Sequence, residues 1–403
     1  MVITANFPFT ICLGILLYFP FLLVLVDTFF RAIYLTVAEF SRKPNRKKLP
    51  EELHNIDLLI LVVAHNEQRI IAQTLGLIQS QIMGSAGVDL ALLADNCSDE
   101  TLQIAIDSGV KAFVRLDNNP GKGKALSWLV AQKKDDLDKY DLIAILDADT
   151  IISSEFCNKI RSAFYKVEIQ AIQVFIEPLY SDKFSPTILA AYSEILSQKI
   201  DDDVRSHLGW TIPLRGTGMV FRREVFSRIC VGLETQVDDI ELSIRLARIG
   251  ITVFFAPEAI IYDPKSSNML DLARQRGRWL KGQRQIFSLQ IDDLMKLIIS
   301  GLSGWSLIQA LLFKPKTLLL MIKFCLVLAI WYFTTGPLFY ILEISLLGSI
   351  LIDLLYYFIG LKYVSEPKIY LFALLKAPLY FVLWFTSWLF SIIPGKKWLR
   401  ARD

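Results

Sequence analysis

Short apolar runs alternate with amphipathic segments through the middle of the chain. Aliphatic runs of strand length predict β-strands at residues 58–64, 88–94, 111–116, 142–146 and 171–176. Between them, apolar residues that recur every three to four positions predict helices near 67–81, 99–108, 125–139 and 155–166. This alternation predicts one α/β domain over residues 58–265, with a mostly parallel sheet covered by helices on both faces.

Long apolar segments flank this domain. Residues 7–30 are almost entirely apolar and long enough to cross a bilayer, so we expect a transmembrane helix within residues 1–37. A basic linker over 38–57 follows, with Arg42, Lys43, Arg46, Lys47 and Lys48. The positive-inside rule then places the N-terminus outside and the α/β domain in the cytoplasm. A cleaved signal peptide fits less well, because a basic n-region and a small-residue cleavage site are both missing.

The C-terminal third is apolar but less regular. Residues 266–312 show an amphipathic pattern with Arg and Lys on one side, which suits helices at a membrane surface. Residues 318–335 and 338–360 are two candidate spans in a C-terminal membrane region over 313–403, and a third stretch, 370–393, is interrupted by Lys376 and Pro378. Three complete crossings would place the basic tail at 396–402 outside, so we interpret 370–393 as re-entrant or interfacial.

Composition agrees with a membrane protein and argues against several other classes. The chain has 403 residues, 53% of them hydrophobic, which is too apolar for a soluble protein of this length. A net charge of +3 gives no indication of nucleic-acid binding. The five cysteines form no CxxC pair and there are only three histidines, so a zinc site is not expected.

Polar residues follow the first two predicted strands, at the edge where open α/β sheets bind ligands. The first strand runs into Ala64-His65-Asn66-Glu67, which could meet a nucleotide or simply begin the next helix, since Asn is a good N-cap. The second runs into Asp95-Asn96-Cys97-Ser98-Asp99. Asp95 could accept hydrogen bonds from a base or ribose, whereas Asp99 is better interpreted as a helix cap.

Two segments near the third and fourth strands could bind phosphate and metal. The basic loop Asn118-Asn119-Pro120-Gly121-Lys122-Gly123-Lys124 could bind phosphate through amides and ammonium groups, although an ordinary turn explains it better. Asp147 and Asp149 close the fourth strand two positions apart, so their carboxylates converge. Converging carboxylates are costly unless a cation or proton separates them. A hard divalent cation shared with a diphosphate fits this pair better than a plain turn.

Two later motifs carry further candidate chemistry. Asp238 and Asp239 begin an amphipathic helix, where either could be a general base or both could merely oppose the helix dipole. Gln275, Arg278 and Trp279 share one helical face, because they stand at positions i, i+3 and i+4. An amide, a guanidinium and an indole suit a phosphate and a sugar ring, but the same residues are typical of an interfacial helix.

Taken in order, these motifs resemble those of the membrane-embedded family-2 glycosyltransferases, which include cellulose, chitin, hyaluronan and poly-N-acetylglucosamine synthases. The matching segments lie within about residues 58–285: V-A-H-N-E at 63–67, D-N-C-S-D at 95–99, G-K-G-K-A-L at 121–126, D-A-D at 147–149, G-T-G at 216–218, V-D-D at 237–239 and Q-R-G-R-W at 275–279. The resemblance implies a Rossmann-like glycosyltransferase-A fold and inverting transfer of a hexose or N-acetylhexosamine from a UDP-sugar.

The resemblance also implies a role for each motif. It assigns the nucleotide sugar to Ala64, His65, Glu67, Asp95, Lys124, Asp147, Asp149, Gln275 and Arg278. Asp149 would also ligate Mg²⁺ or Mn²⁺, and Asp239 would be the general base. The acceptor would meet Gly216, Thr217, Gly218, Asp238 and Trp279. Three positions depart from the family pattern, because it often has Tyr at 65, a second Asp at 96 and Glu at 238.

The expected function follows from this resemblance. We expect an enzyme at the bacterial inner membrane that extends a cell-surface polysaccharide, with secretion partner proteins, or alternatively adds one sugar to a lipid-linked acceptor. A transporter is disfavoured because the candidate spans carry few charges, namely Asp27, Lys323, Glu343 and Asp353. A non-catalytic membrane scaffold is disfavoured because the metal and base positions are intact.

Overall fold

The first strand of the sheet, β1 (Leu58–Ala64), shows why the aliphatic runs become strands. All seven of its residues are buried. Leu58, Ile60 and Val62 pack into one core, whereas the alternate residues of the strand pack into a second core on the other face. Because strand side chains alternate between faces, an unbroken aliphatic run is stable only where both faces are covered.

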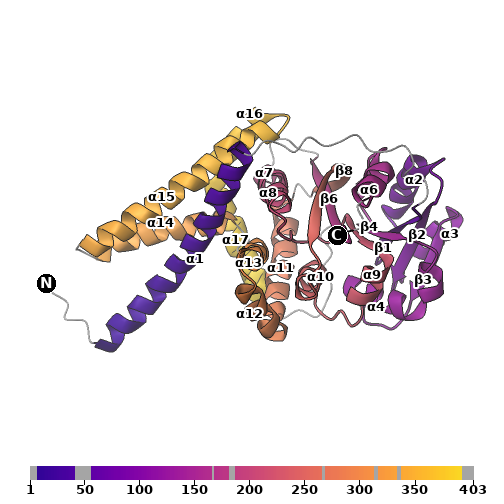
Figure 1. The fold of residues 1–403 in the computed structure, drawn as a ribbon, viewed down its shortest axis with the longest axis horizontal. Helices are drawn as coiled ribbons and strands as arrows, with labels where there is room; N and C mark the ends of the chain where they lie inside the picture. Colours follow the sequence, from indigo (N-terminus) through magenta and orange to yellow (C-terminus); the bar gives the residue numbers. More distant parts are fainter. Residues whose placement is uncertain are drawn as a thin grey trace.

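The computed structural model describes residues 7–40, 56–165, 168–180, 187–265, 268–312, 316–333 and 337–392. Most of the predicted basic linker and the basic tail lie outside these residues. Within them, one eight-stranded sheet has the order β3-β2-β1-β4-β7-β6-β8-β5 (Figure 1). The other strands are β2 (Val88–Asp95), β3 (Lys111–Arg115), β4 (Leu142–Asp147), β5 (Ile151–Ile152), β6 (Ala171–Tyr180), β7 (Met219–Arg222) and β8 (Val253–Lys265). All five strands expected from the sequence are therefore confirmed.

The prediction of a mostly parallel sheet is confirmed, because six of the eight strands run in the same direction and only β5 and β7 are reversed. Strands β3, β2, β1 and β4 are parallel, but β7 runs antiparallel to both β4 and β6, and β5 runs antiparallel to β8. The reversal begins at Gly216 and Gly218, whose φ angles of 85° and 66° are accessible mainly to glycine. The chain turns there and inserts β7 between β4 and β6, so the sheet is mixed.

Helices cover both faces of the sheet, as the sequence predicts. One face packs against α2 (Ile71–Ile82), α3 (Thr101–Asp107) and α6 (Phe156–Ala163). The other packs against α4 (Lys122–Gln132), the short α5 (Lys134–Leu137), α9 (Arg223–Ile229) and α10 (Asp238–Arg248). These α/β layers position the strand ends that carry the motifs.

Outside the sheet, long apolar helices form a second body of the molecule (Figure 1). It comprises α1 (Phe7–Phe40), α14 (Lys316–Phe333), α15 (Pro337–Gly360), the 3₁₀ turn Leu361–Tyr363 and α16 (Pro367–Leu375). Two helical segments, Pro20–Phe40 and Tyr340–Tyr363, are long and apolar enough to cross a membrane, criteria that a buried core helix or a signal sequence also meets.

Several helices lie between the sheet and the apolar helices (Figure 1). They are α7 (Ile188–Leu196), a π-helix (Ser197–Asp202), α8 (Asp203–His207), α11 (Met269–Leu289), α12 (Ile291–Ile299), α13 (Leu302–Leu312) and α17 (Ala377–Ile392). The amphipathic pattern over 266–312 is thus three helices. The interruption predicted in the last apolar stretch separates α16 from α17.

Four charged side chains are buried together among the apolar helices. Arg31 lies 3.1 Å from Asp27 on the same helix and 2.8 Å from Asp353 on α15. Lys323 on α14 lies 2.7 Å from Asp353 and 3.7 Å from Asp27. We call Asp27, Arg31, Lys323 and Asp353 the charge quartet. Its two positive and two negative groups balance, which a charge cluster away from water requires.

Candidate active site

The carboxyl ends of β1, β2 and β3 meet in loops that three asparagines shape. Asn66, Asn96 and Asn118 adopt φ angles of 57°, 51° and 59°, a region that Asn tolerates better than other side-chain-bearing residues. The Asn66 side-chain oxygen accepts hydrogen bonds from the amides of Ser98 (2.6 Å) and Asp99 (3.3 Å). Asn66 therefore ties the first loop to the second and does not cap α2, which begins at Ile71.

The remaining residues of the first two motifs lie close to this junction. His65 Nδ1 lies 2.6 Å from the carbonyl oxygen of Asp95, and the Glu67 amide donates to Thr101 Oγ1 (2.7 Å). Ala64 is buried at the end of β1. Asp99 accepts from the amide of Thr101 (3.0 Å), the first residue of α3, although Glu100 stands at the N-cap position and makes no side-chain capping bond. The two motifs are thus brought together at one edge of the sheet.

Asp95 is more constrained than the sequence indicates. The residue is 2% exposed, and its carboxylate accepts hydrogen bonds from Arg115, from the backbone amide of Gly121 (2.6 Å) and from the side-chain NH₂ group of Asn96 (2.8 Å). Arg115 also pairs with Asp117. A base contact by Asp95 stays a prediction, and it would have to share the carboxylate with these three donors. Arg115 reads from the sequence as an ordinary strand residue, so this pairing was missed.

The structure explains why Asn rather than Asp stands at position 96. The Asn96 oxygen accepts from the amides of Asp117 and Asn118, both at 2.8 Å. Its NH₂ group donates to the carboxylates of Asp95 (2.8 Å) and Asp117 (3.1 Å). An aspartate could not donate these bonds and would add a third carboxylate to the group.

Lys122 contacts Asp147, the first of the paired aspartates, whereas Lys124, the lysine that the resemblance assigns to the nucleotide sugar, has a different partner. Lys122 Nζ donates to the Asp147 carboxylate and to the Gly216 carbonyl oxygen (2.7 Å), whereas Lys124 Nζ donates to Asn119 Oδ1 (2.5 Å). Burial lowers the pKa of Lys122, but Asp147, Asp238 and Asp239 outweigh it and raise that pKa overall. The two lysines are equivalent in sequence, so only the tertiary structure separates them.

Asp147 and Asp149 form a turn at the end of β4, next to the G-T-G segment. The Asp147 amide donates to Thr217 Oγ1 (3.1 Å), and Thr217 Oγ1 lies 2.9 Å from Thr150 Oγ1. The Asp147 side chain is 45% exposed, so one carboxylate faces the open side of this edge. Because Lys122 holds Gly216 and Thr217 holds Asp147, the D-A-D and G-T-G segments form one unit.

The carboxylates at this edge suit a metal shared with a ligand better than a closed metal site. Over the described ranges, no group of three or more His, Cys, Asp or Glu is arranged to hold a metal ion. Two aspartate carboxylates would leave the remaining positions of a six-coordinate Mg²⁺ or Mn²⁺ to phosphate oxygens and water, which such ions commonly accept. The residues present therefore fit a metal that arrives with a diphosphate.

Asp238 has the more perturbed carboxyl of the second aspartate pair. Burial raises its pKa to about 7, and neighbouring Asp239 and Asp147 add to this while Lys122 opposes it. Its Oδ2 atom is buried, and among the described residues it has no hydrogen-bond partner. The Asp239 carboxylate accepts from the Ile240 amide (2.9 Å) at the start of α10. Both interpretations of this pair, as dipole partners and as a base, therefore find support.

The Q-R-G-R-W helix, α11, lies between the aspartate pair and α17. A Cβ added to Gly282 would lie 2.4 Å from Val237 Cγ1, so α11 touches the residue directly before Asp238. Gly282 is four positions after Arg278, so Arg278 lies on the same helical face, with Trp279 beside it. Burial lowers the pKa of Arg278, and Trp279 is 49% exposed. This placement supports a role at the site.

The opposite face of α11 packs against α17. The Arg276 guanidinium lies 4.4 Å from the centre of the Trp384 ring, and a Cβ on Gly277 would approach Phe390 to 2.9 Å. These two residues of the motif therefore have packing roles, whereas Gln275, Arg278 and Trp279 share the stripe that includes Gly282.

A charged group that the sequence did not suggest lies near Asp147. Lys265 at the end of β8 lies 2.6 Å from Asp263 and 2.9 Å from Glu194 on α7. Burial raises the pKa of Asp263, with Lys265 opposing and Glu194 and Asp147 adding to the rise. Asp263 and Lys265 lie at the end of β8. Because β8 was not predicted from the sequence, their position at a strand end could not be recognised.

Comparison with known proteins agrees with this geometry. The family model described as glycosyl transferase family group 2 matches residues 142–393, more than half of the chain. The chain belongs to this family. The matched range includes the D-A-D, G-T-G, V-D-D and Q-R-G-R-W segments.

Curated relatives are distant. A beta-monoglucosyldiacylglycerol synthase of Trichormus variabilis is 25% identical over 264 residues, covering 63% of this chain and 54% of that protein. The probable glycosyltransferase YdaM of Bacillus subtilis is 24% identical over 282 residues, covering 63% of this chain and 60% of that protein. The match thus spans little more than half the length of these relatives.

A solved structure shows the same fold. The mannosyltransferase PcManGT of Pyrobaculum calidifontis, in complex with GDP-Man and Mn²⁺, superposes with a TM-score of 0.50 at 15% identity, covering 88% of this chain and 99% of that one. This likeness establishes a glycosyltransferase-A-like α/β fold for the chain. The expected glycosyltransferase-A-like α/β fold is therefore confirmed, with a mixed sheet.

Proposed function

We propose that the chain transfers a hexose from a UDP-sugar to the hydroxyl group of a lipid acceptor. The observation that carries this proposal is the arrangement of Lys122, Asp147 and Gly216 beside the buried carboxyl of Asp238. It combines a positive group, an accessible carboxylate and a candidate base at one edge of the sheet. These are the groups that a displacement with a diphosphate leaving group requires.

The proposed reaction is a single in-line displacement with inversion. Asp149, with Asp147, would hold Mg²⁺ or Mn²⁺, which supplies positive charge to the departing diphosphate. Arg278 would bind the same diphosphate through paired hydrogen bonds. Asp239 would take the proton of the acceptor hydroxyl, and the buried carboxyl of Asp238 would border that position. The G-T-G segment would hold the acceptor near Asp147.

Two observations favour a lipid acceptor over the growing polysaccharide that the motifs implied. A curated relative is named for glucosyl-diacylglycerol synthesis. Apolar side chains are also exposed on α11 and on α17, which packs against it, namely Trp279, Phe287 and Leu289 on α11 and Phe385 and Trp388 on α17. Such a surface suits an acceptor that approaches from a lipid layer. We therefore propose that α1 and the hairpin of α14 and α15 lie in the bacterial inner membrane, with the catalytic domain on the cytoplasmic side.

The experiment that tests this proposal supplies purified protein with a panel of UDP-sugars and Mg²⁺ or Mn²⁺. UDP release is measured with and without diacylglycerol in mixed micelles, and the product is separated by size. We expect acceptor-dependent UDP release and one sugar per lipid, with Asp239→Asn as the inactive control, lowered by about 10²–10⁴ in rate. A ladder of long glycans would favour polysaccharide extension. Absence of UDP release with every donor would contradict the proposal.

The membrane orientation has its own test. Protease added to the outside of intact spheroplasts should leave the region from 38 to 312 uncut, because the basic linker favours the cytoplasmic side. Cleavage within the linker from outside would contradict the orientation and leave the chemistry untouched.

A further inference from the structure

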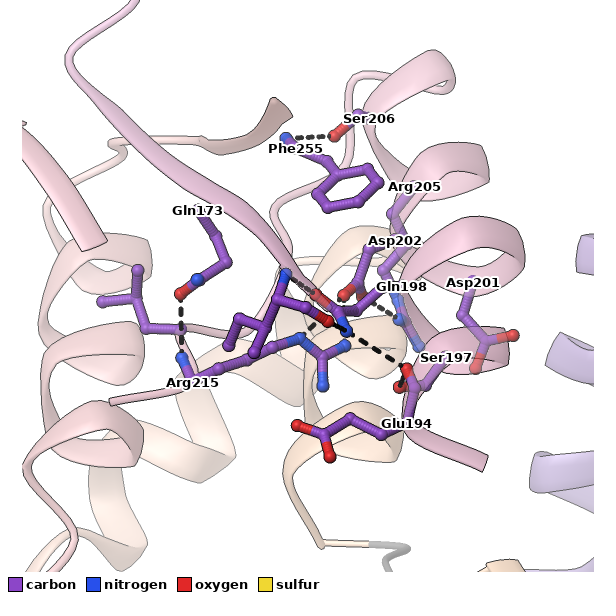
Figure 2. A network of polar contacts seen from close by, with 12 residues as sticks. Gln173, Glu194, Ser197, Gln198, Asp201, Asp202, Arg205, Ser206, Arg215 and Phe255 are labelled. Carbon is purple, nitrogen blue, oxygen red and sulfur yellow. Dashed lines mark hydrogen bonds and ion pairs between the residues drawn. The ribbon is translucent and has the colours of Figure 1, made fainter. Parts of the chain in front are cut away.

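Figure 2 shows a network of polar contacts that includes Gln173, Asp202 and Arg215. This network also holds the G-T-G segment. Gln173 on β6 donates from its side chain to the carbonyl oxygens of Thr217 (2.9 Å) and Gly218 (3.2 Å). Its own side-chain oxygen accepts from the Arg215 amide (3.0 Å). The Arg215 guanidinium pairs with the carboxylate of Asp202, with Nε at 3.2 Å. The segment is therefore fixed both to the sheet and to the π-helix.

The π-helix directs two adjacent carboxylates to different parts of the molecule. Asp201 and Asp202 are 2% and 0% exposed. The Tyr356 hydroxyl of α15 donates to Asp201 (2.9 Å), whereas Asp202 accepts from Arg205 (2.8 Å) and from Arg215. π-helical turns are rare and occur frequently at functional sites. This one joins a long apolar helix to the loop that precedes the G-T-G segment.

The hydrogen bonds continue from Arg205 to the charge quartet. Arg205 donates to the side-chain oxygen of Gln309 on α13 (2.8 Å), and Gln309 donates to Asp27 on α1 (2.7 Å). An unbroken series of polar contacts thus runs from Asp27 through Arg205 and Asp202 to Arg215. Each buried charge in the series needs its partner, because an uncompensated charge away from water is strongly destabilising.

We propose that Arg215 is a positioning residue for the transfer reaction, held by Asp202 so that helices α1 and α13 set the place of the G-T-G segment relative to Asp147. This inference rests on the proposed function. Gly216 accepts from Lys122, and Thr217 accepts from the Asp147 amide, so a shift of the segment moves both groups. A misplacement of about 1 Å at reacting groups costs about 100-fold in rate.

The test compares Arg215→Gln, Arg215→Lys and Asp202→Asn with the wild type. Arg215→Gln leaves the Asp202–Arg205 pair intact, so it releases the loop with the least effect on folding. We expect it to lower kcat for transfer by about 100-fold with a much smaller change in the KM for the donor, and Arg215→Lys to restore part of the loss. In a double-mutant cycle, Asp202→Asn should lower kcat little further than Arg215→Gln alone, because the contact between the two residues is already lost. It should still lower stability, because it also removes the ion pair of Asp202 with Arg205.

A second measurement does not depend on turnover. The Gly218 amide donates to the Ile145 carbonyl oxygen (2.9 Å), so amide hydrogen exchange over 145–150 and 214–219 reports the position of the segment. Arg215→Gln should speed amide exchange in these two segments. Glu39→Gln should not, although it breaks the exposed ion pair between Glu39 on α1 and Lys362 in the 3₁₀ turn that follows α15. Unchanged exchange and unchanged kcat per folded molecule would overturn the inference. Altered exchange in a protein without transferase activity would instead contradict the proposed function.

Discussion

Gly282→Ala tests the contact between the Q-R-G-R-W helix and the aspartate pair. The added Cβ would lie 2.4 Å from Val237 Cγ1 and 2.9 Å from Cγ2. Apolar carbons prefer about 3.5–4.0 Å, so α11 and the segment at Val237 must separate by about 1 Å. Asp238 and Asp239 directly follow Val237, and a shift of that size at reacting groups corresponds to a loss of about 100-fold in kcat.

Stability should change much less than catalysis. Overpacking costs about 1–3 kcal/mol, and the better helix propensity of Ala returns about 1 kcal/mol. The net free energy of unfolding should therefore fall by at most about 2 kcal/mol. Gly76→Ala on α2 is the matched control, because a Cβ there meets nothing within 4 Å. That control should keep kcat and gain stability.

The assay is kcat for acceptor-dependent UDP release, read beside the thermal midpoint of each variant. The double variant Gly282→Ala/Val237→Ala removes the two methyl groups that would clash, so it should recover much of the lost rate. If Gly282→Ala keeps the kcat of the wild type, or if the double variant is no faster than Gly282→Ala, the contact does not place the aspartate pair.

The other predictions concern metal, charge and the donor site. Excess EDTA should stop UDP release, and Asp149→Asn should do the same in the presence of added Mn²⁺, because a carboxylate ligand is lost. Burial raises the pKa of Asp238 to about 7 from its usual 3.8, so the stability that this group contributes at low pH is lost as the pH rises through about 7. The melting temperature of Asp238→Asn relative to the wild type should therefore increase between about pH 4 and 7 and stay level above that. Asn96→Asp should raise the KM for the UDP-sugar more than it lowers kcat, because it breaks the bonds that hold Asp95 and Asp117. Arg278→Lys should lose most of the activity although the charge is kept, since Lys cannot form the paired hydrogen bonds of Arg. An unchanged KM in Asn96→Asp would contradict the role assigned to Asn96, and full activity in Arg278→Lys would contradict the role assigned to Arg278.

The parts of the fold that the sequence predicted have strong local patterns. Strands β1, β2 and β4 are nearly unbroken aliphatic runs, and such runs need no knowledge of their neighbours to be recognised. β5 and β7 are two and four residues long, too short to show a period. β8 contains Pro257, and its register with β6 shifts between Val174 and Phe175, so it resembles a loop in sequence.

The site residues also divide into those that a local sequence pattern predicted and those that depend on contacts between distant segments. Asp147 and Asp149 were predictable because the aliphatic run of β4 places them at a strand end. Lys122 was not, because the two lysines stand in the same short loop motif and only their partners in the folded loop, Asp147 for Lys122 and Asn119 for Lys124, distinguish them. The π-helix was not predictable either. Its adjacent residues Asp201 and Asp202 bind Tyr356 and Arg215, and these two partners lie on segments that are far apart in the sequence.

The composition of the charge quartet also bears on how the protein is made. Asp27 and Arg31 pair within one helix, so α1 leaves the ribosome with its buried charges already compensated. Lys323 and Asp353 lie on the successive helices α14 and α15, so that hairpin is electrically balanced as soon as its second helix is synthesised. In the bilayer location that we propose, each of these two units enters the lipid with zero net buried charge. Neither unit therefore needs a charged side chain of the other unit to compensate its own buried charges on insertion.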